Sequence, residues 1–459
     1  MSFPRYPTYK DSGVKWLGEV PVHWCLPKLK QIATFSGGGT PSRENPDYWS
    51  GDIPWVSPKD MKTEQLAGAE ESITATGLVN STASLVPPNR LLMVVRSGIL
   101  KHTIPVAINQ IEVALNQDMK ALDFGDEGLT SSFFLRWVQG LNDLLLLEWA
   151  KQGATVESIE HEYLANTVVP MPTADERVAI ASFLDRETAK IDVLVAEQEQ
   201  LITLLKEKRQ AVISHAVTKG LDPSVPMKDS GVEWLGDVPA HWGIKTIAKS
   251  STKITNGYVG PTRDILVEQG IPYIQATHIK SGKVNFGEDY FVEEQWSLAH
   301  AKSILKKGDV LIVQTGAGTG DIGLVTDAEE GFNCHALIIV SPDTDQLMGE
   351  YLAAVLSSTY GECKLESIQT GAMHPHLNCG EVKFVEIPIP PIHEQAAIVA
   401  EFRRSVDMFD NLSKEAFDVI VILQERRSAL ISAAVTGQID VRGLAPAQEQ
   451  AAYDPRPQR

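Results

Sequence analysis

KDSGVKWLGEVPVHW, residues 10–24, occurs a second time as KDSGVEWLGDVPAHW, residues 228–242. Twelve of the fifteen positions are identical, and the two copies lie 218 residues apart. A tryptophan-rich segment does not recur at this level by chance, and a repeat at a fixed distance indicates a duplicated structural unit. The stretch therefore predicts a chain built from two copies of one scaffold.

The same distance relates landmarks along most of the chain. IPWVSPKDMK from Ile53 matches IPYIQATHIK from Ile271, LLMVVRSG from Leu91 matches DVLIVQTG from Asp309, Gly153-Ala154 matches Gly371-Ala372, VVPMP from Val168 matches VEIPIP from Val385, and KEKRQAVISHAVT from Lys206 matches QERRSALISAAVT from Gln424. Identity between these landmarks is low. The two copies therefore share scaffold positions and differ in the residues between them.

Each copy divides into a mixed domain and a long helix. Short apolar runs, turns rich in Gly, Pro, Asn and Ser, and one helix-like stretch predict a mixed α/β domain, with that stretch at residues 131–149 and 346–357. We expect these mixed α/β domains at 1–165 and 221–383, helical regions at 166–220 and 384–440, and a disordered polar tail at 441–459.

Capping signals delimit the two long helices. Thr173 and Glu176 form a capping box at the start of the first helix, which we expect to end at Gly220. The second helix begins at PPIHEQ, keeps Glu394 without a threonine cap, and ends at Gly437. A helix of about 44 residues would be about 65 Å long.

An apolar repeat close to seven residues runs along both helices and predicts that each packs on a partner helix. In the first helix, one core position is expected at Leu184, Ile191, Gln198, Leu205 and Val212, and the other at Glu187, Leu194, Leu201 and Lys208. In the second helix they are Phe402, Phe409, Ala416, Leu423 and Leu430, and Ser405, Leu412, Val419 and Arg426. We expect an antiparallel coiled coil within the chain, with the domains at opposite ends; separate helical hairpins or an intermolecular coiled coil are the alternatives.

Composition places the 459-residue chain among ordinary globular proteins, with 43% apolar and 22% charged residues. No apolar run is long enough for a membrane helix, and MSFPRYPTYK lacks the apolar core of a signal peptide. Cys25, Cys334, Cys363 and Cys379 form no CxxC pair and are expected to be reduced. These features predict a cytoplasmic protein without a membrane partner.

The formal net charge is −18, and no block of the chain is basic. Holding nucleic acid through bulk charge requires a positive surface. The balance therefore predicts that any nucleic-acid binding depends on local patches, or on a partner that supplies the positive charge.

No motif predicts chemistry. QTGAGTGDIG, residues 314–323, follows a strand but lacks the GK[ST] ending of a phosphate loop; its small residues suit close approach to DNA. NPDYW, residues 45–49, resembles an adenine methyltransferase motif only superficially. Cys363, His374, His376 and Cys379 have no common zinc spacing. We expect no catalytic residue and no metal site.

The ordered landmarks resemble the specificity subunit of type I restriction–modification systems. The residues that carry the resemblance are SGGGTPSRENPDYWSGDIPWVSPKDM from Ser36, LLMVVRSG from Leu91, IPIPPIHEQAAI from Ile387, and the helix ends KEKRQAVISHAVTKG and QERRSALISAAVTG. The resemblance covers nearly all of residues 10–440.

The resemblance implies an α+β fold with two target-recognition domains separated by two long helices. It implies binding of a bipartite, asymmetric double-stranded DNA target, with no catalysis and no cofactor in this chain. Two modification subunits would use S-adenosylmethionine to methylate adenine, and two restriction subunits, where present, would use ATP and Mg. The alternatives are a coiled-coil scaffold, a DNA-binding subunit of another methyltransferase-type defence system, or an enzyme fused to a DNA-recognition region.

Polar residues in the loops that differ between the copies are the candidate DNA contacts. Arg, Gln and Asn suit paired hydrogen bonds to bases, and Lys and Thr suit phosphates. The first domain offers Thr40, Ser42, Arg43, Lys59, Lys62, Arg96, Ser97, Lys101 and His102, and the second offers Asn256, Tyr258, Thr262, Arg263, Gln275, Thr277, His278, Lys280, Gln314 and Thr315.

Two scaffold expectations remain. Arg177 stands where the second copy has Gln395, which predicts a less regular partner contact at that helix start. The repeated fifteen-residue stretch lies at the entry to each domain. We expect residues 10–24 to lie near residues 430–440, so that the end of the chain returns to its beginning.

Overall fold

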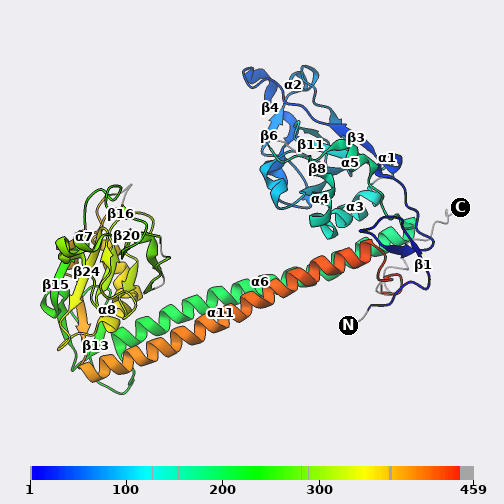
Figure 1. Cartoon of the computed structure of the whole chain (residues 1–459). Helices are drawn as coiled ribbons and strands as arrows, with labels where there is room; N and C mark the ends of the chain where they lie inside the picture. The colour runs from blue at the N-terminus through cyan, green and yellow to red at the C-terminus, as the bar shows by residue number, and fades with distance from the viewer. Residues whose placement is uncertain are drawn as a thin grey trace. The chain divides into compact units, whose positions relative to one another are not determined.

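The computed structural model describes residues 3–126, 128–151, 156–280, 282–287, 289–371 and 375–444. The chain forms two compact units: residues 1–198 with 418–459 make unit 1, and residues 199–417 make unit 2. The division crosses both long helices, so each unit contains one mixed domain and part of each helix (Figure 1). The landmark residues Gly153, Ala154 and Ala372, and tail residues 445–459, lie outside the described residues.

The central sheet of unit 1 has the order β3 (Thr34–Gly37), β11 (Met119–Asp123), β8 (Leu91–Val94), β9 (Val106–Asn109) and β5 (Gln65–Leu66). All four residues of β8 are buried, which explains its unbroken apolar sequence, because a strand covered on both faces has no polar side. A second sheet has the order β6 (Glu71–Ile73), β4 (Trp49–Val56), β10 (Val113–Leu115) and β7 (Leu85–Val86).

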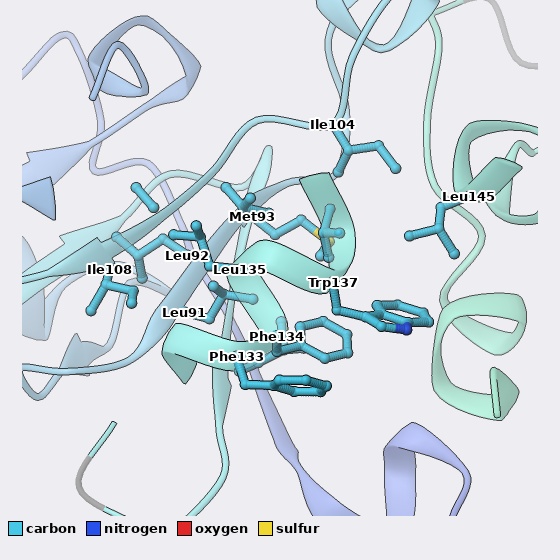
Figure 2. Packing of buried hydrophobic residues seen from close by; sticks show 14 of the residues in the cluster. Leu91, Leu92, Met93, Ile104, Ile108, Phe133, Phe134, Leu135, Trp137 and Leu145 are labelled. Carbon is cyan, nitrogen blue, oxygen red and sulfur yellow. The ribbon is translucent and has the colours of Figure 1, made fainter. Parts of the chain in front are cut away.

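The helix-like stretch predicted at residues 131–149 is two helices, α3 (Leu129–Gly140) and α4 (Asn142–Trp149). The break lies at Leu141, and the Asn142 side chain accepts a hydrogen bond from the Ile104 amide at 2.8 Å, which ties α4 to a neighbouring loop. Figure 2 shows how Phe133, Phe134 and Trp137 pack among the aliphatic side chains of β8 and their neighbours. The core of unit 1 therefore lies between α3 and the central sheet.

Unit 2 repeats this architecture with the offset already seen in the sequence. Its central sheet has the order β15 (Ser251–Asn256), β24 (Leu337–Pro342), β21 (Val310–Val313), β22 (Ile322–Leu324), β19 (Gly282–Val284) and β18 (Ile279–Lys280). Its second sheet has the order β16 (Leu266–Val267), β20 (Phe291–Val292), β17 (Ile271–Ile274) and β23 (Asn333–Cys334). The helix stretch predicted at 346–357 is α8 (Gly349–Leu356), followed by α9 (Thr359–Ser367).

Shorter elements complete the two units. Unit 1 also has α1 (Leu29–Ile32), α2 (Ala75–Val79), α5 (His161–Asn166), η1 (Pro46–Tyr48), η2 (Pro58–Asp60) and η3 (Gly98–Lys101). Unit 2 also has α7 (Glu294–Ala299), α10 (Cys379–Val382), η4 (Ile247–Ser250), η5 (Ala276–His278), η6 (Ala301–Ser303), and the pair β14 (Gly243–Thr246) and β25 (Glu386–Ile389).

The repeated fifteen-residue stretch folds the same way in both units. It forms the hairpins β1 (Tyr9–Asp11) with β2 (Glu19–Pro21), and β12 (Met227–Asp229) with β13 (Asp237–Pro239). The amine of Lys10 donates to the Trp24 carbonyl at 2.6 Å, and the amine of Lys228 donates to the Trp242 carbonyl at 2.5 Å. The near-identity of the two copies therefore reflects one local structure built twice.

The long helices are α6 (Ala174–Lys219) and α11 (Ile392–Val435), and they run antiparallel within each unit (Figure 1). Ion pairs set their register: Asp192 meets Arg427 at 3.0 Å in unit 1, and Arg209 meets Asp410 at 3.4 Å in unit 2. The offset of 218 residues relates both aspartates and both arginines. The same two repeat positions therefore join the helices in each unit, and the predicted antiparallel coiled coil is confirmed.

No helix in the described part of the chain is long and apolar enough to cross a membrane.

Half of the predicted helix seam is correct. The first core position is buried or half-buried throughout, from Leu184 to Val212 and from Phe402 to Leu430. The second predicted position lies one residue too early for six of its eight members: Leu194, Leu201, Lys208, Leu412, Val419 and Arg426 are exposed, whereas Glu187 is half-buried and Ser405 is buried. The seam instead contains Thr188, Val195, Ile202, Arg209 and Ala216 of α6, and Val406, Ser413, Ile420, Arg427 and Ala434 of α11. A heptad allows a step of three or four residues, and the exposed apolar residues on the helices favoured the wrong step.

The end of the chain returns to its beginning, as predicted. The Tyr9 hydroxyl donates to the Gly437 carbonyl at 3.0 Å, and the Asp440 amide donates to the Pro4 carbonyl at 2.8 Å. Gly437 packs so closely on Pro21 that an added Cβ would lie 2.4 Å from its ring. Hairpin β1–β2 therefore supports the C-terminal end of α11 in unit 1.

Candidate nucleic-acid interface

Several loops of unit 1 meet beyond one end of the strands of its central sheet. β3 and β8 both run antiparallel to β11, so both end where β11 begins. β4 ends beside the same turn, because the Asn116 amide donates to the Val56 carbonyl at 2.9 Å. We call residues 38–45, 57–62, 95–102 and 116–118 the loop edge of unit 1. It contains all nine residues predicted to contact DNA in the first domain: Thr40, Ser42, Arg43, Lys59, Lys62, Arg96, Ser97, Lys101 and His102.

Residues 116–118 connect two of these loops. The Thr40 hydroxyl donates to the Gln117 side chain, and the Arg96 Nε donates to Asp118 Oδ1 at 2.6 Å. The Arg96 side chain is 53% exposed, and in the described residues its two terminal amino groups have no hydrogen-bond acceptor. Two parallel donors suit the O6 and N7 acceptors of guanine. Asp118 therefore orients Arg96 while leaving it able to contact a base.

Arg43 is held more completely. Its two terminal nitrogens donate to both Glu71 oxygens at 2.5 and 2.8 Å, and its guanidinium lies 3.8 Å from the Trp49 ring centre. Hydrogen bonds from Arg43 hold the pKa of Glu71 below its usual value. Arg43 can reach a base only by giving up this carboxylate, which makes it a weaker candidate than Arg96.

Two tryptophans fix the loop that carries Arg43. The indole Nε1 of Trp49 donates to the Ser42 carbonyl at 3.0 Å, and that of Trp55 donates to the Gly39 carbonyl at 2.9 Å. A Cβ at Gly38 would lie 2.1 Å from the Asn116 carbonyl oxygen, so only glycine fits there. The motif NPDYW is thus the turn η1 and the start of β4, with a structural tryptophan.

The remaining unit 1 candidates are polar and mostly exposed. Lys62 pairs with Glu70 at 2.7 Å, whereas Lys59, Lys101 and His102 are exposed and lie within 4.0 Å of no described carboxylate oxygen. The half-buried Ser97 caps η3 and its amide donates to the Glu157 carbonyl at 3.0 Å. Lysines of this kind suit phosphate contacts, which position a protein on DNA without reading sequence.

Unit 2 has a corresponding loop edge, formed by residues 256–263, 275–280, 314–321 and 375–377. β15 and β21 end there and β24 begins there, since Asn256 pairs with Ile338 and Val313 pairs with Leu337. The segment after β21 meets the segment before β25, because Thr315 bridges to His376 and the Thr319 hydroxyl donates to the Pro375 carbonyl at 3.3 Å. The corresponding bridge in unit 1 joins Arg96 to Ser158.

Two of the ten unit 2 candidates are buried, which corrects the expectation that they are exposed loop residues. The Gln314 amide is 5% exposed and donates to Asn256 at 3.1 Å and to the Leu377 carbonyl at 3.4 Å. His278 is 5% exposed, its Nδ1 accepts from the Gln275 amide at 3.1 Å, and burial lowers its pKa. These two side chains stabilise the loop edge from inside.

The other eight candidates are exposed or half-buried at this edge: Asn256, Tyr258, Thr262, Arg263, Gln275, Thr277, Lys280 and Thr315. Lys280 lies near Asp321, whose pKa is raised by burial despite this cation. The Tyr258 ring packs edge-on against Trp296 at 5.0 Å and His300 at 5.2 Å. Trp296 of α7 and His300, which follows that helix, were not predicted, because both lie in a variable stretch without a counterpart landmark.

Two sequence patterns, the glycine-rich stretch after β21 and the Cys and His residues near residue 370, were considered for a phosphate loop and a metal site. The glycine-rich residues 316–320 lead into strand β22 rather than a helix, so they lack the helix start of a phosphate loop. Among the described residues, no group of His, Cys, Asp and Glu side chains is arranged to hold a metal ion. His374, one of the four Cys and His residues without a common zinc spacing, lies outside the described residues.

Arg177 and Gln395, where the sequence predicts a less regular partner contact, both bind their own unit, and that partner contact stays a prediction. Arg177 donates to the Pro172 carbonyl at 3.0 Å and lies 3.5 Å from Asp126. Gln395 is fully buried, donates to the carbonyls of Gln346 and Pro390, and accepts from the Met348 amide at 2.9 Å. Each residue therefore joins a helix start to the mixed domain beside it.

Comparison with protein families gives a match over most of the chain. The family model described as "Type I restriction modification DNA specificity domain" matches residues 21–203 and 244–415, one range in each copy. These ranges include both loop edges.

Named relatives agree with this match. The EcoR124I/EcoR124II specificity subunit of Escherichia coli is 29% identical over 235 residues, which is 51% of this chain and 52% of that protein, so this match spans about half of each. The MjaIX specificity subunit of Methanocaldococcus jannaschii is 21% identical over 439 residues, covering 93% of this chain and 96% of that protein.

Solved structures show the same fold. A chain from a study of complex assembly and conformational transition in the type I R-M system has a TM-score of 0.70 at 14% identity, covering 91% of this chain and 98% of that chain. The HsdS subunit from Thermoanaerobacter tengcongensis has a TM-score of 0.50 with the same identity and coverage.

Proposed function

Because the chain belongs to the type I restriction modification DNA specificity family, we propose that each of its units reads one half of a bipartite double-stranded DNA target. The observation that carries this proposal is the loop edge, which is built twice on one strand order from different side chains. A repeated frame with different polar groups is suited to two different half-sites, because frame residues position and loop residues specify.

The long helices offer surfaces for partner subunits. Unit 1 exposes Val193, Leu194, Val419, Val421 and Ile422 on them, and unit 2 exposes Leu201, Leu204, Met408, Leu412 and Phe417. Exposed apolar residues in such numbers are typical of interaction surfaces. We assign these surfaces to two modification subunits, with two restriction subunits in complexes that cleave DNA.

The chemistry of the proposed complex resides in these partners. The modification subunits would bind S-adenosylmethionine and methylate adenine, and restriction subunits would use ATP and Mg, whereas this chain binds DNA, without catalysis, in the cytoplasm. The net charge of −18 supports a division of labour in which partners provide much of the phosphate contact.

Methylation mapping tests the proposal. The chain is expressed with its modification subunit in a host that lacks N6-methyladenine, and methylated sites are mapped across the genome. We expect one split motif with a modified adenine in each half, and exchange of unit 1 loops should change only one half. A complex that assembles but leaves the genome unmethylated, and whose chain binds no duplex in an anisotropy titration, would favour the scaffold alternative.

A further inference from the structure

An apolar pocket of about 260 Å³ lies in unit 2 where α6 ends and α11 begins. Its wall includes the aliphatic side chains of Leu221 and Ile398, and the polar groups of His241 and Glu394 lie at one side. The pocket is remote in sequence from the loop edge, and neither the strands nor the proposed DNA contacts account for it.

The internal repeat shows what such a pocket accommodates. In unit 1 the corresponding place is filled by Tyr6, which is only 4% exposed. The Tyr6 ring lies 5.7 Å from the His23 ring and 5.8 Å from the Trp24 ring, and the Arg442 guanidinium lies 4.8 Å from its centre. Burial and the nearby carboxylate of Glu176 raise the pKa of Tyr6.

The glutamates at the two corresponding places differ in how far they are exposed. His23 meets Glu176 at 2.8 Å in unit 1, and His241 meets Glu394 at 2.7 Å in unit 2. The Glu176 side chain is 5% exposed and has Arg442 at 3.8 Å, whereas the Glu394 side chain is 32% exposed. The same acid with the same histidine is therefore covered in unit 1 and open in unit 2.

The chain itself explains why the unit 2 pocket is open. Unit 1 covers its site with two separate segments, one before hairpin β1–β2 and one after α11, whereas in unit 2 a single linker follows α6 and leads into β12. Ser224 in that linker corresponds, by the offset of 218, both to Tyr6 and to Arg442. The repeat position that holds an aromatic residue and an arginine in unit 1 thus holds one serine in unit 2, and residues 221–228 contain no aromatic side chain.

An aspartate beside each place also differs between the units in its charged partner. Asp440 of unit 1 is bound by Arg442 at 2.6 Å, but its counterpart Asp222 is bound only by Ser224, at 2.6 and 2.9 Å, in the described residues. The open pocket is therefore flanked by two carboxylates without an arginine, Asp222 and Glu394. An occupant that complements it has one aromatic side chain and a neighbouring arginine.

We propose that this pocket is a docking site for a partner protein, which inserts a tyrosine and places an arginine beside Glu394 and Asp222. The occupant reproduces the contacts that Tyr6 and Arg442 make in unit 1. Binding requires neither DNA nor the loop edges, so it can be measured separately from target recognition.

The test uses a labelled synthetic peptide with the sequence of residues 3–9, FPRYPTY, and the full chain in an anisotropy titration. We expect saturable binding that is lost when the peptide tyrosine that corresponds to Tyr6 is replaced by serine. Ser224→Tyr, which supplies a ring from the linker, should weaken binding at least about tenfold, equivalent to about 1.4 kcal/mol. Met227→Tyr, which adds a ring at an exposed position of β12 outside the pocket lining, is the matched control and should bind like the wild type.

Three results would overturn the proposal. The first is no saturable binding up to millimolar peptide, and the second is equal binding by the wild type and Ser224→Tyr. If thermal unfolding shows that Ser224→Tyr does not fold, Ala397→Phe, at an exposed residue of the pocket wall, takes its place and should weaken peptide binding to the same extent. The third is binding that appears only after Tyr453→Ala, which would show that the tail of this chain, rather than a partner, occupies the pocket.

Discussion

At the scale of single residues, contacts within the chain separate candidates that the sequence treats alike. Arg43 and Arg96 are both exposed arginines in variable loops, yet Arg43 uses both terminal nitrogens on Glu71 while Arg96 uses only Nε on Asp118. A side chain with free, oriented donors is better prepared to read a base. Gln314, which corresponds to Arg96 in the repeat, is buried and supports the loop instead.

Replacement of Arg96 by alanine should weaken recognition of one half-site. Loss of a paired base contact costs about 1–3 kcal/mol, so affinity for the target should fall by about tenfold or more and substitutions in that half-site should be tolerated. The measurement is a titration of the assembled complex against duplexes altered in either half. Arg90→Ala is the control, because Arg90 pairs with Asp123 at the opposite edge of the sheet. Equal loss of discrimination in both halves would contradict the assignment.

Glu176 predicts a pH-dependent contribution to stability. Burial would raise its pKa, but hydrogen bonds from His23 and Thr173 outweigh burial and hold the pKa below the usual 4.5. A lowered folded-state pKa stabilises the protein above about pH 4.5, and this contribution is lost as the pH falls through the lowered value. Glu176→Gln can keep the capping hydrogen bonds but removes the charge that faces His23 and Arg442, so it should cost about 1 kcal/mol at pH 7.

The measurement is urea unfolding of both proteins from pH 7 downwards. The difference between wild type and variant should shrink below pH 4.5. Glu197→Gln, on an exposed part of α6, is the control substitution. A difference that stays constant with pH would mean that the carboxylate charge does not contribute.

At the scale of elements, the long helices carry two apolar surfaces that the sequence could not distinguish. One is the seam between α6 and α11, and the other is the exposed set assigned to partner subunits. Both repeat close to every seven residues, so periodicity alone predicted one correct seam position and one incorrect position. The burial of Val406 and Ile420, together with the ion pairs Asp192–Arg427 and Arg209–Asp410, identifies the face that forms the seam.

Two isoleucines on α11 test this distinction. Ile420 is 7% exposed in the seam, so Ile420→Ala should lower the free energy of unfolding by about 2–4 kcal/mol. Ile422 is 62% exposed, so Ile422→Ala should leave the unfolding of the isolated chain almost unchanged but weaken assembly with the modification subunit. Denaturant unfolding and analytical ultracentrifugation measure the two effects. The reverse pattern would exchange the seam and the partner surface.

At the scale of the whole molecule, each unit joins segments that lie far apart in the chain. Unit 1 contains both the first and the last described residues, and the Tyr9–Gly437 hydrogen bond connects them. In unit 2 the corresponding helix end, Gly220, packs on Trp242 and Pro239 of the second hairpin. In each unit the fifteen-residue repeat therefore packs against the end of one long helix, and its histidine binds the glutamate at the start of the other.

Gly437→Ala should disturb this closure. Gly437 has a φ of +76°, and a Cβ would lie 2.4 Å from the Pro21 ring and 3.1 Å from Trp24. Backbone strain and the clash together should cost about 2 kcal/mol or more. Differential scanning calorimetry should show a lower transition temperature, and Gly443→Ala, with no atom within 4 Å of the added carbon, should not. An unchanged transition would indicate that this contact adds nothing to stability.

The sequence by itself determined the duplication, the capped ends of both helices, the first seam position, the return of the chain end to its start, and the family. These features are local or periodic, and an internal repeat makes them visible in one chain. The tertiary structure alone decided the second seam position, the burial of Gln314 and His278, the Arg43–Glu71 pair, and the open pocket beside Glu394. Each of these depends on which distant side chains meet, and spacing along a chain specifies a face or a turn but not the neighbour that packs against it.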